Sequence, residues 1–270
     1  MNKRTLLISD YSLTECPLGG TELTDTILIE QLGADFIKSS FFTNGAGYDK
    51  IIVSNAWELN PIGREWLESN GFDFKIEHDF QLFAHRIPDG YPDFKAPESE
   101  LRNVKLYKAA KRVIFQSSYQ KNIFDLNIKL NKTYNLEGNI WRDDELDFFE
   151  NTPSTKNGRC AILRGRSFSK GFAQAVEIAD SLRLKVDVLD NMPYSDFIRE
   201  LSKYSNVLLY PLRSESFGRV AAEASMMGVA VLTNKFMACT AAPWWESNRF
   251  EIVRYMRNCK KNLFNLLSEN

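Results

Sequence analysis

The stretch Asn206–Gly228, NVLLYPLRSESFGRVAAEASMMG, carries the pattern that decides the fold. It opens with an apolar run, continues through a polar turn that contains one glycine, and ends in small residues with helical spacing. A buried strand followed by a turn and a helix is the repeating unit of a parallel α/β sheet. Such sheets bind ligands at the carboxyl ends of their strands, so a binding site is expected at the turn Ser214–Gly218.

The same alternation of strands and helices runs through the rest of the chain, on both sides of a polar segment. Strands are predicted at residues 4–10, 48–55, 74–78, 112–116, 132–137, 160–164, 185–189, 206–211 and 229–233, and helices at 21–32, 63–70, 98–111, 118–126, 171–182, 194–203 and 219–227. Asn151–Gly158, NTPSTKNG, has no periodicity and is predicted to be a linker. We therefore expect an α/β protein with two Rossmann-like parallel-sheet domains, at 1–150 and 159–243, and a helical segment at 244–270.

The composition excludes several classes of protein. The chain has 270 residues with 13% aromatic residues, which excludes disorder, and its formal net charge of -1 argues against a uniformly basic nucleic-acid binder. No apolar run reaches the ~18 residues that span a bilayer, and no secretory signal peptide is readable at the start. Four scattered cysteines lack metal or disulfide spacing: Cys16, Cys160, Cys239 and Cys259. We expect a cytoplasmic protein with reduced thiols.

The turn and helix after residue 213 form the strongest chemical signal. A helix start offers unpaired N–H groups and a positive dipole end, which suit a phosphate, and Gly218 lets a ligand approach the backbone. Glu215 and Glu223, eight residues apart, can line one elongated ligand, with Glu223 bonding a vicinal diol. The alternative is an amphipathic helix with two solvated glutamates.

Three weaker motifs also follow predicted strands. In Arg164–Gly171, RGRSFSKG, two arginines and a lysine can neutralise phosphate charge; a loop of solvated cations is the alternative. In PLGGTE, Gly19 and Gly20 permit positive φ and close ligand approach, although a plain tight turn also uses a glycine pair. His78 ends a strand where a ligand is expected, although a lone histidine is more often structural. No metal-ligand spacing such as HExxH or CxxC and no Asp-x-Asp pattern occurs, so no metal site is predicted.

Taken in order, these motifs resemble glycosyltransferase family 4, whose members are retaining nucleotide-sugar glycosyltransferases of the GT-B fold. The matches are Gly19-Gly20-Thr21-Glu22, His78, Gly165-Arg166 with Lys170-Gly171, and Glu215-x7-Glu223 with Phe217-Gly218. The resemblance covers most of residues 1–235. It implies two domains that face a cleft, with a C-terminal helix that returns to the first domain.

The resemblance also implies residue roles. His78, Arg166, Lys170 and Glu215 are the expected catalytic residues, and Gly19, Gly20, Arg164, Phe217, Gly218 and Glu223 the expected donor-binding residues. The gap between Arg166 and Lys170 is shorter than is usual in the family, so Arg164 is the alternative phosphate-binding arginine. The implied co-substrate is a UDP- or GDP-linked sugar, and no metal or other cofactor is implied.

The sequence leaves the acceptor open. It is expected to be a glycan, a lipid-linked molecule or a small molecule, with a nucleic-acid base such as hydroxymethylated phage DNA as the alternative. Cations in the tail can contact a nucleic-acid backbone or a membrane surface, with a solvated helix face as the alternative. A second basic cluster, which can bear on the acceptor, comprises Lys105, Lys108, Lys111 and Arg112. A third hypothesis is a module that binds nucleotide or glycan without turnover.

Overall fold

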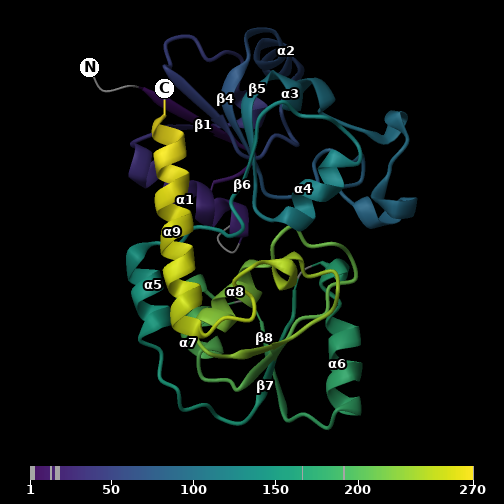
Figure 1. Cartoon of the computed structure of the whole chain (residues 1–270), viewed down its shortest axis with the longest axis vertical. Helices are drawn as coiled ribbons and strands as arrows, with labels where there is room; N and C mark the ends of the chain where they lie inside the picture. The colour runs from purple at the N-terminus through teal and green to yellow at the C-terminus, as the bar shows by residue number, and fades with distance from the viewer. Residues whose placement is uncertain (1–3, 13, 16–18, 166, 191, 270) are drawn as a thin grey trace. The chain divides into compact units, whose positions relative to one another are not determined.

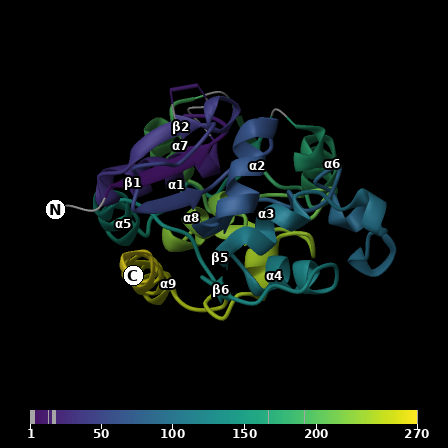
Figure 2. The ribbon, with the colours of Figure 1, turned by 90° about the horizontal axis from the view of Figure 1, so that it is seen from above.

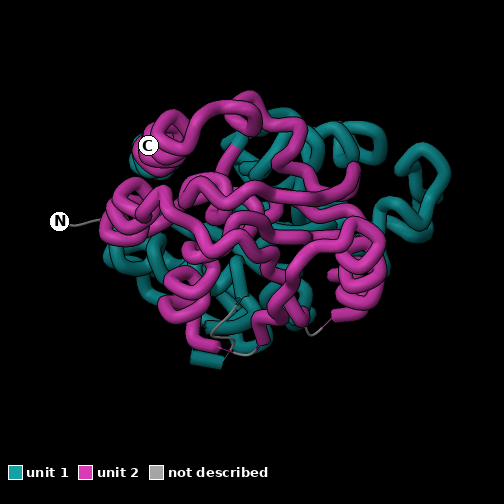
Figure 3. The backbone as a smooth tube through the Cα atoms, turned by 90° about the horizontal axis from the view of Figure 1, so that it is seen from below, with its two compact units in different colours: residues 1–137, 263–270 teal, residues 138–262 magenta. Residues whose placement is uncertain are grey.

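The computed structural model describes residues 4–12, 14–15, 19–165, 167–190 and 192–269. The chain divides into two compact units, which Figure 3 shows in different colours. Unit 1 comprises Met1–Glu137 together with Leu263–Asn270, and unit 2 comprises Gly138–Asn262. Helix α9 (Arg249–Ser268), the long yellow helix of Figure 1, therefore begins in unit 2, and its last residues belong to unit 1.

Unit 1 is built on a six-stranded sheet in which all neighbouring strands are parallel. Its strands are β1 (Thr5–Ser9), β2 (Asp35–Lys38), β3 (Lys50–Val53), β4 (Phe72–Glu77), β5 (Ala110–Phe115) and β6 (Thr133–Asn135), in the order β2-β1-β3-β4-β5-β6. Its helices are α1 (Gly20–Leu32), α2 (Pro61–Asn70), α3 (Val104–Ala109) and α4 (Ser118–Asp125), with 3₁₀ turns that include η1 (Ser39–Phe41). Helices α2 and α3 lie side by side (Figure 2). From β1 the chain continues to β2 on one side and then to β3 on the other, so the strand order reverses between β1 and β3. In open α/β sheets ligands bind at the carboxyl ends of the strands at such a switch point.

Unit 2 is built on a smaller parallel sheet of four strands. These are β7 (Cys160–Leu163), β8 (Val186–Leu189), β9 (Asn206–Leu208) and β10 (Ala230–Leu232), in the order β10-β9-β7-β8. Its other elements are α5 (Asp143–Glu150), the 3₁₀ turn η5 (Phe168–Lys170), α6 (Phe172–Ser181), α7 (Tyr194–Leu201), α8 (Arg219–Met226) and the 3₁₀ turn η6 (Ala238–Ala241). Because β7 and β9 are neighbours, the loops that follow them start side by side.

The predicted fold class is confirmed: the protein is α/β, with two Rossmann-like units of parallel sheet. Two elements were missed, because β2 is short and half exposed and because the acidic helix α5 has few apolar residues. The predicted helix 98–111 is wrong in extent, since α3 ends at Ala109 and Lys111 lies in strand β5. Among the described residues, no helix combines the length and apolarity that crossing a membrane requires.

The division of the chain differs from the predicted domains 1–150, 159–243 and 244–270. Unit 2 begins at Gly138 and already contains α5, which precedes the expected linker. Ion pairs hold α5 to α9, with 2.6 Å between Arg257 and Asp147 and 2.9 Å between Lys260 and Asp143. The linker was misplaced because the polar composition of 151–158 marks a loop within unit 2 and not its border.

Two glycines fix the backbone near the carboxyl ends of β7 and β9. Gly171 and Gly218 both have positive φ, at +67° and +97°. A Cβ at Gly171 would lie 1.9 Å from the carbonyl oxygen of Tyr210, and one at Gly218 would lie 2.1 Å from Sδ of Met237. Since the backbone at Tyr210 cannot move away freely, Gly171 brings the loop after β9 against the turn η5.

We predict that Gly171→Ala lowers the free energy of unfolding by more than 2 kcal/mol, about 1–2 kcal/mol for the left-handed backbone plus the clash with Tyr210. The matched control is Gly158→Ala, because Gly158 has a similar φ of +71° but nothing within 4 Å of its Cβ position. Urea denaturation of both variants measures the difference. Equal losses in the two variants would contradict the close backbone contact.

Candidate active site

Lys170 and Glu215 meet at the carboxyl edge of the unit 2 sheet. The ammonium group of Lys170 lies 2.7 and 2.9 Å from the two carboxylate oxygens of Glu215. Lys170 ends η5, which follows β7, and Glu215 follows β9, so the two predicted residues come from neighbouring strands. The Lys170 side chain is half exposed, and the pair is therefore open to an anionic ligand.

Backbone contacts hold the two loops in place. The N–H of Leu212 donates to the carbonyl of Ser169 at 2.8 Å, and the N–H of Glu215 donates to the carbonyl of Phe236 at the same distance. A Cβ on Gly165 would lie 2.9 Å from Cγ of Lys170, so this glycine leaves room for the lysine stem. The positions of Lys170 and Glu215 are thus set by main-chain contacts within the unit.

The N-terminus of α8 begins directly after this pair. Gly218 is its N-cap, and within the described residues no side-chain cap hydrogen bond forms there, so the first N–H groups suit an anion. The ring of Phe217 is 2% exposed and packs between Trp141 and Trp244, at centroid distances of 6.5 and 6.1 Å. The side chain of Phe217 is therefore a core anchor for the turn, and only its backbone is placed to meet a ligand.

Glu223 is completely buried in α8. Its Oε1 accepts hydrogen bonds from Trp141 Nε1 at 2.9 Å, the Tyr194 hydroxyl at 2.6 Å and Arg219 Nε at 2.9 Å. Burial raises the pKa of this carboxyl group, and the Arg219 charge opposes that shift. Among the described residues, Oε2 of Glu223 and Nη2 of Arg219 have no hydrogen-bond partner. The expected diol ligand of Glu223 is therefore not in reach without a movement of the side chains around it.

Of the two candidate phosphate-binding arginines, the structure describes only Arg164. Arg164 lies 3.5 Å from Asp190 at the end of β8, and its guanidinium sits 5.0 Å from the ring centroid of Phe172. Arg164 is thus engaged with the next strand along the sheet. Arg166 lies outside the described residues.

In unit 1, the glycine pair forms the start of α1. Gly19 is the N-cap, with an extended φ of -77°, and Gly20 is the first helical residue. Neither residue uses the positive φ that glycine permits, because the chain enters α1 through a normal N-cap conformation. Among the described residues no side chain caps α1 at Gly19, and the buried carboxyl group of Glu22 accepts a hydrogen bond from its own backbone N–H in the first turn.

His78 follows β4 and lies in a buried polar cluster. Its Nε2 is 3.7 Å from Oδ1 of Asp25 in α1, and its Nδ1 is 3.1 Å from the side-chain amide of Gln116 after β5. Burial raises the pKa of Asp25 to about 7, while a hydrogen bond of 2.5 Å from Ser54 opposes the rise. His78 is thus held between two side chains, and the structure adds Asp25 to the site.

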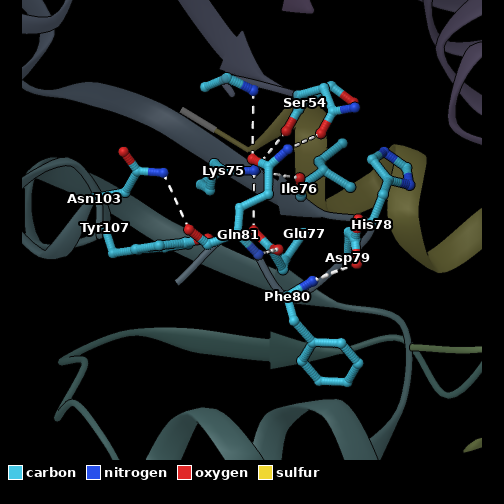
Figure 4. A network of polar contacts seen from close by, with 12 residues as sticks. Ser54, Lys75, Ile76, Glu77, His78, Asp79, Phe80, Gln81, Asn103 and Tyr107 are labelled. Atoms are coloured by element: carbon cyan, nitrogen blue, oxygen red, sulfur yellow. Dashed lines mark hydrogen bonds and ion pairs between the residues drawn. The ribbon is translucent and has the colours of Figure 1, made fainter. Parts of the chain in front are cut away.

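A second buried network supports this edge of the sheet (Figure 4). On β4, Lys75 and Glu77 are almost completely buried and lie 3.1 Å apart, and the Tyr107 hydroxyl donates to Glu77 at 2.6 Å. Lys75 also donates to the backbone carbonyls of Ser54 and Ile76. A buried ion pair is tolerated only with such additional hydrogen bonds. The network ties the ends of β3 and β4 together next to His78.

Four cations of the predicted basic patches are paired with carboxylates within their own unit. Lys111 lies 2.7 Å from Asp73, Arg112 lies 3.4 Å from Glu269, and Arg257 and Lys260 bind the acidic face of α5. Pairing of this kind reduces the positive potential that would attract a polyanion. In the described part of the chain, no group of three histidine, cysteine or carboxylate side chains is arranged to hold a metal ion.

Comparison with known proteins rests on structure. No protein-family model matches the chain. No curated protein matches its sequence. Solved structures do match: HepE of Anabaena in complex with UDP and glucose, at 15% identity and a TM-score of 0.59, covers 97% of this chain and 100% of its own. The fold is that of the GT-B glycosyltransferases.

Two further solved structures match over the whole length. The trehalose-6-phosphate synthase OtsA has a TM-score of 0.64 at 8% identity and covers 99% of this chain and 100% of its own. An alpha-glucosyltransferase solved with UDP and DNA that contains an HMU base has a TM-score of 0.53 at 10% identity, with full coverage of both chains. At these identities the likeness establishes the fold.

We predict that Asp25→Asn changes the pH dependence of stability. Because the pKa of Asp25 is about 7 in the fold and 3.8 ordinarily, the folded protein keeps a proton that the unfolded chain loses as the pH rises from about 4 to 7. The wild type therefore loses stability over that interval. The asparagine introduced in the variant cannot ionise, so the variant is spared this loss, which amounts to up to about 4 kcal/mol in the free energy of unfolding. The charged or titratable groups that face the same carboxyl group are His78, Glu22 and Lys75.

Denaturation curves at pH 4, 6 and 8 provide the measurement. Asp125→Asn is the matched control, since Asp125 is an exposed carboxylate of unit 1 paired with Lys121, and it should leave the pH dependence of the wild type unchanged. If Asp25→Asn and the wild type have parallel stability profiles, the raised pKa of Asp25 is wrong.

Proposed function

We propose that this protein is a glycosyltransferase that moves a sugar from a UDP- or GDP-linked donor to an acceptor. The observation that carries the proposal is the site in unit 2: a half-exposed Lys170–Glu215 pair beside the uncapped start of α8. A lysine ammonium and helix N–H groups together suit a diphosphate. The structural neighbours solved with UDP or UDP-glucose support a nucleotide ligand for this fold.

In this proposal the leaving diphosphate is the group that the site stabilises. Its negative charge grows as the bond to the sugar breaks, so a fixed cation and oriented N–H groups bind the transition state more tightly than the ground state. Lys170 exchanges Glu215 for the phosphate oxygens, and the released Glu215 carboxylate accepts hydrogen bonds from sugar hydroxyls. The positive charge comes from Lys170, with Arg166 as its proposed partner, and no metal is required.

The resemblance to family 4 adds the stereochemical part of the proposal. The acceptor attacks the face that the diphosphate leaves, and the leaving phosphate oxygen takes the acceptor proton, so the anomeric configuration is retained. The same resemblance assigns His78 to the donor sugar and Gly19 and Gly20 to the diphosphate. Because the His78 side chain is 3% exposed and held between Asp25 and Gln116, its contact with a sugar also requires neighbouring side chains to move. The ribose meets Oε2 of Glu223 after the partly exposed Tyr194 moves aside.

We predict that Lys170→Ala lowers kcat/KM for UDP or GDP release by about 10²–10³-fold, the usual loss when one transition-state contact of this kind is removed. The measurement is nucleoside diphosphate release from a panel of nucleotide sugars, first chosen by thermal shift. Lys203→Ala is the matched control. It also breaks an exposed Lys–Glu pair, with Glu200, but at the opposite end of the sheet, before β9, and should retain wild-type activity.

The same experiment separates turnover from binding alone. If the wild type is stabilised by a nucleotide sugar but releases no nucleoside diphosphate with any acceptor, the protein is a binding module. If Lys170→Ala retains the wild-type kcat/KM, the diphosphate site is not at Lys170 and the proposal fails.

A further inference from the structure

Three aromatic side chains are exposed at one edge of the unit 1 sheet. Tyr11 follows β1, Phe41 lies in η1 after β2, and Trp57 follows β3, with exposed fractions of 38%, 69% and 40%. These strands are adjacent in the order β2-β1-β3, so the three rings come from the same carboxyl edge. We call Tyr11, Phe41 and Trp57 the aromatic edge.

A buried carboxylate fixes the backbone beneath the aromatic edge. Asp10 is 2% exposed and accepts hydrogen bonds at 3.0 Å from the backbone N–H groups of Trp57 and Glu58, and another from the Ser39 hydroxyl. The Tyr11 hydroxyl donates to the Glu58 carboxylate. The aromatic residues are thus held in place before any ligand binds, which lowers the ordering cost of binding.

Cations accompany the rings and are themselves paired. Lys38 lies 5.6 Å from the ring centroid of Tyr11 and 2.7 Å from Glu15. Arg86 lies 5.5 Å from the ring centroid of Trp57, and its Nε donates to Asp79 at 2.6 Å. Asp79 is the residue after His78, so polar groups continue from the aromatic edge to the proposed catalytic histidine.

We propose that the aromatic edge is the acceptor subsite and that the acceptor is a carbohydrate, an inference that rests on the proposed glycosyltransferase activity. The C–H face of a pyranose ring packs on an aromatic face, and its hydroxyls require fixed polar partners at the rim. The rings of Trp57 and Tyr11 supply the faces, and Glu58, Arg86 and Asp79 supply the partners.

The charges at this edge favour a neutral sugar over a nucleic acid. Lys38 and Arg86 are each paired with a carboxylate, while Asp10 and Glu58 accept hydrogen bonds from neutral groups. The hydrogen bond to Glu58, burial, and the negative charges of Glu58, Asp10 and Glu15 raise the pKa of Tyr11 to about 12. Nucleic-acid binding relies on cations that neutralise phosphates, and here the local field is negative.

The test compares acceptors in the presence of the donor selected by thermal shift. The probes are p-nitrophenyl hexosides and disaccharides, and a duplex DNA that contains 5-hydroxymethyl bases. We expect saccharides to stimulate nucleoside diphosphate release by the wild type, and Trp57→Ala to lower kcat/KM for the saccharide by at least about tenfold.

Phe250→Ala is the matched control, because Phe250 is a 52% exposed aromatic residue of unit 2 whose ring centroid lies 4.6 Å from the Arg249 guanidinium. It should retain full saccharide stimulation. Stimulation by the DNA alone, or an unchanged saccharide kcat/KM in Trp57→Ala, would overturn the inference.

Failure of the proposed function would be recognised separately. If the wild type releases no nucleoside diphosphate with any donor, saturation-transfer NMR with the same saccharides tests the aromatic edge directly. Binding by the wild type that Trp57→Ala abolishes supports the surface as a saccharide site, and absence of saccharide binding by the wild type contradicts it.

Discussion

The buried carboxyl group of Glu223 organises the proposed donor-binding site of unit 2. Glu223 accepts three hydrogen bonds through one oxygen, from Trp141 before α5, from Tyr194 at the start of α7 and from Arg219 in the first turn of α8. A buried charge costs several kcal/mol unless it is paired and hydrogen-bonded in this way. The cluster therefore fixes the direction of α8, and with it the place to which the first N–H groups of that helix point.

The rest of the unit 2 site follows from that constraint. With α8 fixed, the turn at Phe217 and Gly218 is locked by its aromatic anchor and its left-handed backbone. The loop before the turn is pressed against η5 through Gly171, and this contact brings Glu215 to Lys170. The two units also differ in electrostatic character. Unit 2 offers a lysine and an open helix end, whereas the aromatic edge of unit 1 lies in a negative field.

Local patterns in the sequence predicted the parallel α/β class and the loops that carry Lys170, Glu215 and His78. They could do so because apolar runs and glycine turns depend only on residues that are close together in the sequence. They did not predict contacts that depend on strand order. Tyr11 and Trp57 are 46 positions apart and share an edge only because β1 and β3 are neighbours. Asp25 could have been recognised as a site residue from the sequence, since it is a carboxylate among the apolar positions of α1. The burial of Glu223 could not be predicted in this way, because its hydrogen-bond partners come from three separate segments.

The most direct test of the account is a crystal structure of the protein with UDP bound. The account predicts that the diphosphate lies within hydrogen-bond distance of Lys170 Nζ and of the backbone N–H groups at the start of α8, with Lys170 released from Glu215. A UDP molecule bound elsewhere, with the Lys170–Glu215 pair still intact, would contradict it.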